Sequence, residues 1–89
     1  MNRAEMDGDV AATTLTVLRE VCQQPTLMVS LDMHLDEIAD LDSLRTMEAV
    51  ALLEDRFGVE VDTGALNELA TVEDIVSLVV RALGGQAVG

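Results

Sequence analysis

Apolar residues recur at helical spacing in three stretches of the chain. The first stretch predicts a helix from Asp9 to Gln24, because its apolar positions lie three or four residues apart, at Ala11, Leu15, Leu18 and Cys22. Pro25 should end this helix, since proline lacks a backbone N–H and clashes with the preceding turn. Cys22 lies on the apolar face, so we interpret it as a small core residue rather than a redox site.

The second stretch predicts a helix from Ser43 to Phe57, which contains neither glycine nor proline. Val50, Leu53 and Phe57 share the face that turns to the core. Gly58 then supplies a C-terminal stop, because glycine readily adopts the left-handed conformation in which helices commonly end.

The third stretch predicts a final helix from Val72 to Leu83, with the apolar repeat Val72, Ile75, Val79 and Leu83. Thr71 fits an N-cap, Asp74 fits its capping-box partner, and Gly84 should end the helix. Residues 62–69, between the second and final helices, leave room for one short helix.

The segment from Thr26 to Leu41 is harder to interpret. Its apolar residues alternate at Leu27, Val29, Leu31, Met33 and Leu35, which is typical of a half-buried strand. The other extended candidate, Val59 to Val61, is too short to build a stable sheet with it. We therefore expect a long loop, pinned to a helical core by its apolar side chains, and an all-α fold.

The net charge of the chain narrows the classes of partner that it can bind. The chain carries 17 acidic residues against 5 arginines, giving a net charge of -12, and Phe57 is its one aromatic residue. Such a field repels nucleic acid and anionic membranes and attracts basic protein surfaces. We expect protein partners, and no nucleic-acid or membrane partner.

The length of 89 residues predicts a single domain, which we expect to be monomeric. We place it at residues 9–83, with flexible ends at 1–8 and 84–89. No apolar run is long enough to span a membrane, and residues 1–9 lack the apolar core of a secretory signal. With a single cysteine, the sequence favours the cytoplasm.

Ser43 is the candidate functional residue. It opens a helix, where unpaired backbone N–H groups and the positive end of the dipole favour an anion such as a phosphate ester. Asp42 can cap the helix and leave the Ser43 hydroxyl in solvent. Catalysis by Ser43 itself would need a base and an oxyanion hole, and His34, the single histidine, lies in the predicted loop. We therefore predict a modified serine and no enzyme activity.

The same helix predicts a docking surface. Acidic and apolar residues lie on or beside one exposed side of it, at Leu44, Met47, Glu48, Ala51, Glu54 and Asp55. Exposed apolar residues inside a charged rim suit a protein interface.

The best acidic cluster for a metal is Asp36, Glu37, Asp40 and Asp42. It lacks the calcium-loop pattern, because Arg45 stands where that loop needs glycine, so we predict no metal site.

Three segments, with the spacing between them, resemble the acyl and peptidyl carrier proteins: Leu41-Asp42-Ser43-Leu44, Phe57-Gly58-Val59-Glu60-Val61 and Thr71-Val72-Glu73-Asp74-Ile75. The resemblance covers residues 9–83. It implies an antiparallel four-helix bundle with a long loop between helices one and two and a short third helix. It also implies that Ser43 carries 4′-phosphopantetheine, with Asp42 and Leu44 completing the attachment motif.

By this resemblance the chain is a discrete carrier of acyl or aminoacyl thioesters, serving polyketide, fatty acid or related specialised biosynthesis. Its implied partners are a phosphopantetheinyl transferase, an acyl- or aminoacyl-loading enzyme, and a ketosynthase or other thioester-processing enzyme. Two residues depart from the family pattern: Asp40 replaces a usual glycine, and Arg45 stands where many members have an acidic or neutral residue. The alternative interpretation is an unmodified acidic helical adaptor that binds a basic protein.

Overall fold

A computed structural model describes the backbone of residues 3–38 and 41–88, and the side chains of residues 8–38, 41–62 and 64–84. The helices are α1 (Arg3–Val21), α2 (Ser43–Phe57) and α3 (Val72–Val88), with two 3-10 helices, η1 (Leu35–Glu37) and η2 (Thr63–Glu68). The described residues contain no strand. The predicted all-α fold, with its long first loop and short third helix, is confirmed.

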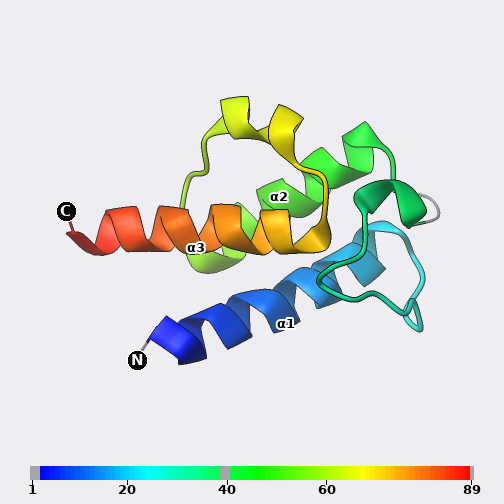
Figure 1. Ribbon diagram of the computed structural model, residues 1–89, viewed down its shortest axis with the longest axis horizontal. Coiled ribbons are helices and arrows are strands. Elements are labelled where there is room, and N and C mark those ends of the chain that lie inside the picture. Colours follow the sequence, from blue (N-terminus) through cyan, green and yellow to red (C-terminus); the bar gives the residue numbers. More distant parts are fainter. Residues whose placement is uncertain (1–2, 39–40, 89) are drawn as a thin grey trace.

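The three α-helices form an antiparallel bundle. α1 runs opposite to both α2 and α3, and it packs against both (Figure 1). The end of α1 and the starts of α2 and α3 therefore gather at one end of the molecule, away from the chain termini (Figure 1). The candidate site lies at this end.

The helix boundaries differ from the predicted ones mainly at the chain ends. The predicted limits of α2 are confirmed. α1 begins at Arg3 rather than Asp9, and α3 continues past Gly84 to Val88 rather than ending at Leu83. Glycine in a helix interior costs only about 1 kcal/mol, so neither Gly8 nor Gly84 stops its helix. The predicted third helix forms as the 3-10 helix η2.

α1 ends at Val21, before the predicted Gln24, in a turn closed by two backbone hydrogen bonds. Gln23 adopts a left-handed conformation with φ of 56°. The N–H of Gln23 donates to the carbonyl of Glu20 at 3.1 Å, and that of Gln24 donates to Arg19 at 3.0 Å. This pairing is that of a Schellman motif, which takes up carbonyls left unpaired at a helix end.

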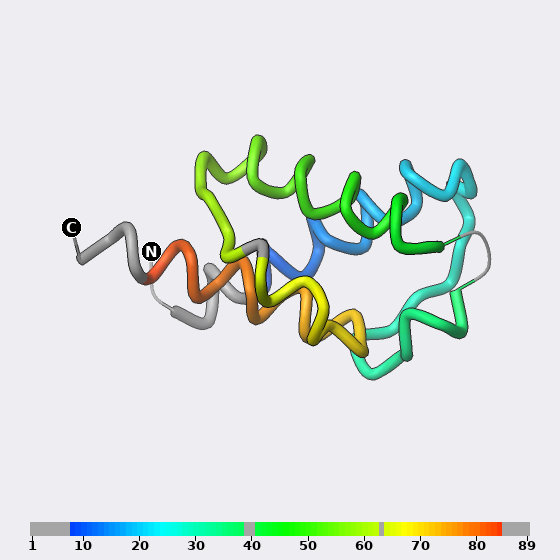
Figure 2. The backbone as a smooth tube through the Cα atoms, turned by 90° about the horizontal axis from the view of Figure 1, so that it is seen from above, coloured from blue at the N-terminus to red at the C-terminus, as the bar shows by residue number. Residues whose placement is uncertain are grey.

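The long loop crosses the start of α3, as Figure 2 shows. The N–H groups of Val72 and Glu73, in the first turn of α3, donate to the carbonyls of Met33 at 3.1 Å and Leu31 at 2.8 Å. These donors have no partner within the helix, so the extended loop supplies their acceptors. One isolated bridge, between His34 and Thr71, is all the β-pairing in the described residues. The preferred loop interpretation is confirmed.

The core lies where the three α-helices meet. Its largest fully buried side chains come from all three: Val10, Thr14, Val17, Leu18, Leu53, Val72, Ile75 and Val79. The buried Thr14 hydroxyl donates to the Val10 carbonyl at 2.7 Å, which satisfies its hydrogen bond within α1. Cys22 is also buried, as predicted.

The same substitution at two glycines should change stability in opposite directions. Gly58 ends α2 with φ of 64°, whereas Gly8 lies inside α1, and an added Cβ at either position meets no atom within 4 Å. Gly58→Ala should lower the free energy of unfolding by about 1 kcal/mol, through backbone strain alone. Gly8→Ala should raise it by about 0.5–1 kcal/mol, through helix propensity. Urea denaturation measures both, and shifts of the same sign would contradict this account.

Candidate functional site

The start of α2 is capped by Asp42. This residue is extended, with φ of -97°, and its side chain accepts a hydrogen bond from the Arg45 N–H at 2.8 Å. Its carbonyl accepts from the N–H and the hydroxyl of Thr46, both at 2.9 Å. The predicted cap is confirmed, and it uses no atom of Ser43.

Ser43 is the first residue of α2 and its side chain is exposed. Its hydroxyl makes no hydrogen bond to the described part of the chain. The residue borders an open hollow of about 460 Å³ between the start of α2, η1 and η2. The other residues that line this hollow are Leu35, Asp36, Leu41, Asp42, Thr46, Met47, Leu66, Asn67 and Leu69.

This arrangement fits a covalent group that is attached to Ser43 through a phosphate. A phosphodiester on Ser43 would lie at the positive end of the α2 dipole, where an anion is stabilised by about 0.3–1 kcal/mol. The hollow mixes leucines with carboxylate, hydroxyl and amide groups. Its lining therefore offers both hydrogen-bonding and apolar contacts.

Arg45 connects α2 to α1. Its Nη1 donates to the carbonyl of Val21, the last residue of α1, at 2.5 Å. The predicted departure from the family pattern at this position thus has a structural role. Asp40, the other departure, lies outside the described residues, as does its place in the acidic cluster.

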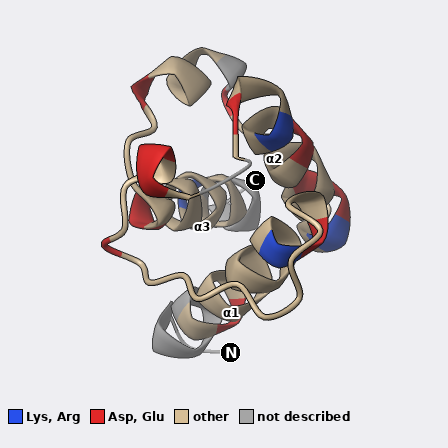
Figure 3. Ribbon diagram, turned by 90° about the vertical axis from the view of Figure 1, so that its right-hand side faces the viewer, with Lys and Arg blue, Asp and Glu red and all other residues tan. Residues whose placement is uncertain are grey.

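The predicted docking surface is largely exposed. Leu44 and Met47 are 66% and 55% exposed. Glu48, Ala51 and Asp55 are also exposed, and Figure 3 shows acidic residues at several positions along α2. Glu54 differs, because it is half-buried and its Oε2 accepts a hydrogen bond from the Val61 N–H at 2.9 Å. Glu54 therefore holds the chain that follows α2.

Two features of this end escaped the sequence interpretation. Leu52 is 37% exposed, beside the predicted docking residues. Its position on the helix, one turn after Glu48, was the available signal. Asn67 borders the hollow from η2, 24 residues after Ser43. No local pattern connects those two positions, so only the fold brings them together.

His34 and the acidic side chains are the other candidate residues from the sequence. His34 has an exposed side chain, and its backbone N–H donates to Glu37 at 3.3 Å. Within the described residues, no three histidine, cysteine or acidic side chains are placed to bind a metal ion. In the same part of the chain, no helix has both the length and the apolar character needed to cross a membrane.

Asp74 anchors the short connection between η2 and α3, which borders the hollow at Leu69. Its Oδ2 accepts the N–H groups of Thr71 and Ala70, both at 2.9 Å, while its own N–H donates to the Thr71 hydroxyl at 3.3 Å. The hydrogen bonds from Thr71 and Ala70 hold the pKa of the Asp74 carboxyl below its ordinary value. The predicted capping box is confirmed.

Comparison with known proteins gives a consistent match. Residues 12–79 match a family model described as the phosphopantetheine attachment site. An acyl carrier protein of Beutenbergia cavernae is 30% identical over 79 residues, which cover 89% of this chain and 96% of the relative. One from Thermobifida fusca is 29% identical over 63 residues, covering 71% of this chain and 80% of the relative.

A solved structure has the same fold. The crystal structure of an acyl carrier protein from Thermotoga maritima matches with a TM-score of 0.78 at 17% identity. The match covers 91% of this chain and 94% of that one.

Asp74 should make stability depend on pH in a defined direction. Because its pKa is lowered on folding, its contribution is present above the unfolded pKa and is lost as pH falls through the folded value. Asp74→Ala should therefore cost about 1 kcal/mol at pH 7 and progressively less in acid. Urea denaturation of both proteins from pH 7 to pH 2 measures the difference. A difference that does not shrink in acid would contradict this assignment.

Proposed function

Because the chain belongs to the phosphopantetheine-attachment family, we propose that it is an acyl carrier protein whose 4′-phosphopantetheine arm is attached at Ser43. Members of this family are non-catalytic carriers with this prosthetic group covalently bound. When attached, the arm supplies a terminal thiol that holds cargo as a thioester. The residues of this chain hold the arm and present it to other proteins.

Support for Ser43 comes from its place at the start of α2. The hydroxyl is exposed, and Asp42 caps the helix without it. No described hydrogen bond to Ser43 supplies a base, so the proton must be removed by a separate enzyme. In that step the Ser43 oxygen bonds to the coenzyme A phosphorus that carries pantetheine. The bond from that phosphorus to the bridging diphosphate oxygen breaks, 3′,5′-ADP leaves, and the transferase takes the serine proton.

Partner enzymes would meet the acidic and apolar side of α2. Leu44 and Met47 expose apolar surface beside the exposed acids Glu48 and Asp55. A partner with basic residues around an apolar side chain complements this surface. The carrier would serve fatty acid, polyketide or related specialised biosynthesis in the cytoplasm, with residues 9–83 as the carrier domain.

The attachment site can be tested by modification with purified enzyme. Incubation with coenzyme A and a broad-specificity phosphopantetheinyl transferase should add one phosphopantetheine, located on Ser43 by peptide mass spectrometry. Ser43→Ala should remain unmodified and keep its helical circular dichroism, because Asp42 still caps α2. Ser77→Ala, which removes an exposed serine on α3, is the matched control and should be modified like the wild type. Modification at another serine would refute the site.

A wild type that several transferases leave unmodified would favour the alternative of an acidic adaptor without a prosthetic group.

The docking surface can be tested separately by charge reversal. Glu48→Arg and Asp55→Arg should each lower the association rate with the transferase by about three- to tenfold, because exposed charges steer encounter.

Asp9→Arg is the control for that reversal, since it makes the same charge change on an exposed residue of α1. Stopped-flow measurements at low salt resolve the rates, and all three variants should unfold close to wild type. Glu54 is left unchanged, because its hydrogen bond to Val61 would confuse stability with docking. Equal slowing by all three variants would place the effect in net charge rather than in α2.

A further inference from the structure

Arg45 makes two hydrogen bonds that together hold the start of α2. Its backbone N–H donates to the Asp42 side chain at 2.8 Å, within the cap. Its guanidinium donates to the Val21 carbonyl at 2.5 Å, across 24 residues of sequence. One residue therefore connects the turn that contains Ser43 to the end of α1.

The end of α1 is a favourable partner for this cation. The last carbonyls of a helix lack intrahelical donors and carry the negative end of its dipole. Turn amides of Gln23 and Gln24 take up the carbonyls of Glu20 and Arg19, and Arg45 takes up that of Val21. The Arg45 bond is partly buried, so solvent and salt screen it less than a surface pair.

Arg45 does not face the proposed phosphate position. Residues two apart on a helix lie about 200° apart around its axis. Ser43 borders the hollow toward η2, whereas Arg45 borders a different hollow with Glu20, Val21 and Gln23 of the α1 end. The guanidinium therefore acts on the backbone that carries Ser43 and not on the attached group.

We propose that Arg45 is a positioning residue, which fixes the first turn of α2 so that the Ser43 hydroxyl is held for phosphopantetheine transfer. This role rests on the proposed attachment at Ser43. Apart from Leu44, the docking residues follow Arg45 on α2 and make no described hydrogen bond to its guanidinium, so loss of the contact with Val21 should leave transferase binding largely intact. The loss should appear in kcat rather than in KM, because the hydroxyl spends less time in the reactive geometry.

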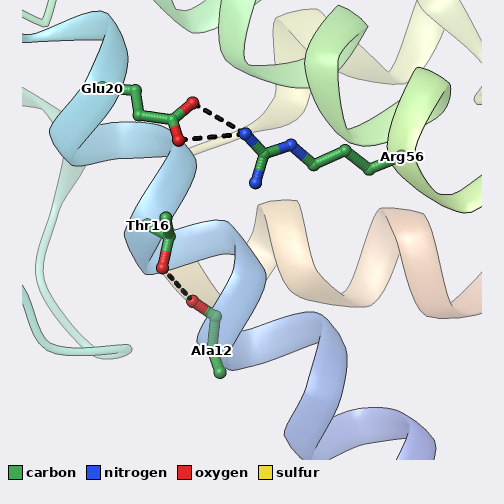
Figure 4. Close-up of polar contacts among 4 residues, drawn as sticks. All are labelled: Ala12, Thr16, Glu20 and Arg56. Carbon is green, nitrogen blue, oxygen red and sulfur yellow. Dashed lines mark hydrogen bonds and ion pairs between the residues drawn. The ribbon is translucent and has the colours of Figure 1, made fainter.

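The chain offers a matched control at the other end of α2. Arg56 also connects α2 to α1, through hydrogen bonds from its Nη2 to both carboxylate oxygens of Glu20 at 2.9 Å (Figure 4). This pair is exposed, with 40% and 47% of the two side chains accessible. Arg45→Gln and Arg56→Gln remove the same charge and one connection each, at opposite ends of α2.

Steady-state kinetics with the transferase and coenzyme A compare the variants. Arg45→Gln should lower kcat by about tenfold and change KM less than about twofold, whereas Arg56→Gln should change neither by more than about twofold. Arg45→Lys should recover most of the loss, since only one donor is used and lysine keeps the charge. Melting temperatures of all variants separate this effect from unfolding.

Hydrogen exchange gives a readout that does not depend on transfer. Arg45→Gln should speed exchange of the Arg45 and Thr46 amides, while Arg56→Gln should leave them unchanged. Equal kcat for Arg45→Gln and wild type, equal loss in both glutamine variants, or no recovery with lysine would each overturn the positioning role. A wild type that no transferase modifies would instead refute the proposed function, and exchange would then decide whether the connection to Val21 exists.

Discussion

The unpaired amides at the start of each helix are the constraint on which this structure most depends. The first turn of an α-helix has N–H groups that its own backbone cannot satisfy. At α2, Asp42 supplies an acceptor, and Ser43 is left exposed beside it. At α3, the acceptors are the carbonyls of Leu31 and Met33, with Asp74 closing the capping box. Because the same loop serves α3 and leads into α2, it brings both helix starts to one end of the bundle.

That end also holds the proposed attachment site and the proposed docking surface. The exposed Ser43 and the hollow beside it lie next to the apolar and acidic residues of α2. A carrier needs these features together, since its arm must be added by one protein and its cargo exchanged with others. The packed helices hold these residues in place, and the strong negative charge of the chain favours basic partners.

The helix ends near the candidate site could be predicted from the sequence by capping preferences. Asp42 and Gly58 bound α2 where capping and left-handed preferences place them, and Thr71 with Asp74 begin α3 as predicted. The outer ends of α1 and α3 differ from the predicted ends because Gly8 and Gly84 lie inside the helices rather than at their limits. A single glycine costs too little to end a helix when helix-forming residues continue beyond it.

Contacts between distant residues could not be predicted in this way. The extended course of the loop follows from the donors of α3, about 40 residues later in the sequence. The Arg45 to Val21 bond spans 24 residues, and Glu54 turned out to bind the Val61 backbone rather than to face only solvent. Side-chain type indicates what such residues can bind, but the packing of the helices decides which partner each one meets.

The most direct measurement is peptide mass spectrometry of this protein isolated from the organism that makes it. Ejection of the phosphopantetheine group during fragmentation identifies the modified peptide without any added transferase. The account predicts that the modified peptide contains Ser43 and that its other serines, such as Ser30 and Ser77, are unmodified. A protein whose Ser43 peptide is always unmodified, or whose group is attached elsewhere, would contradict it.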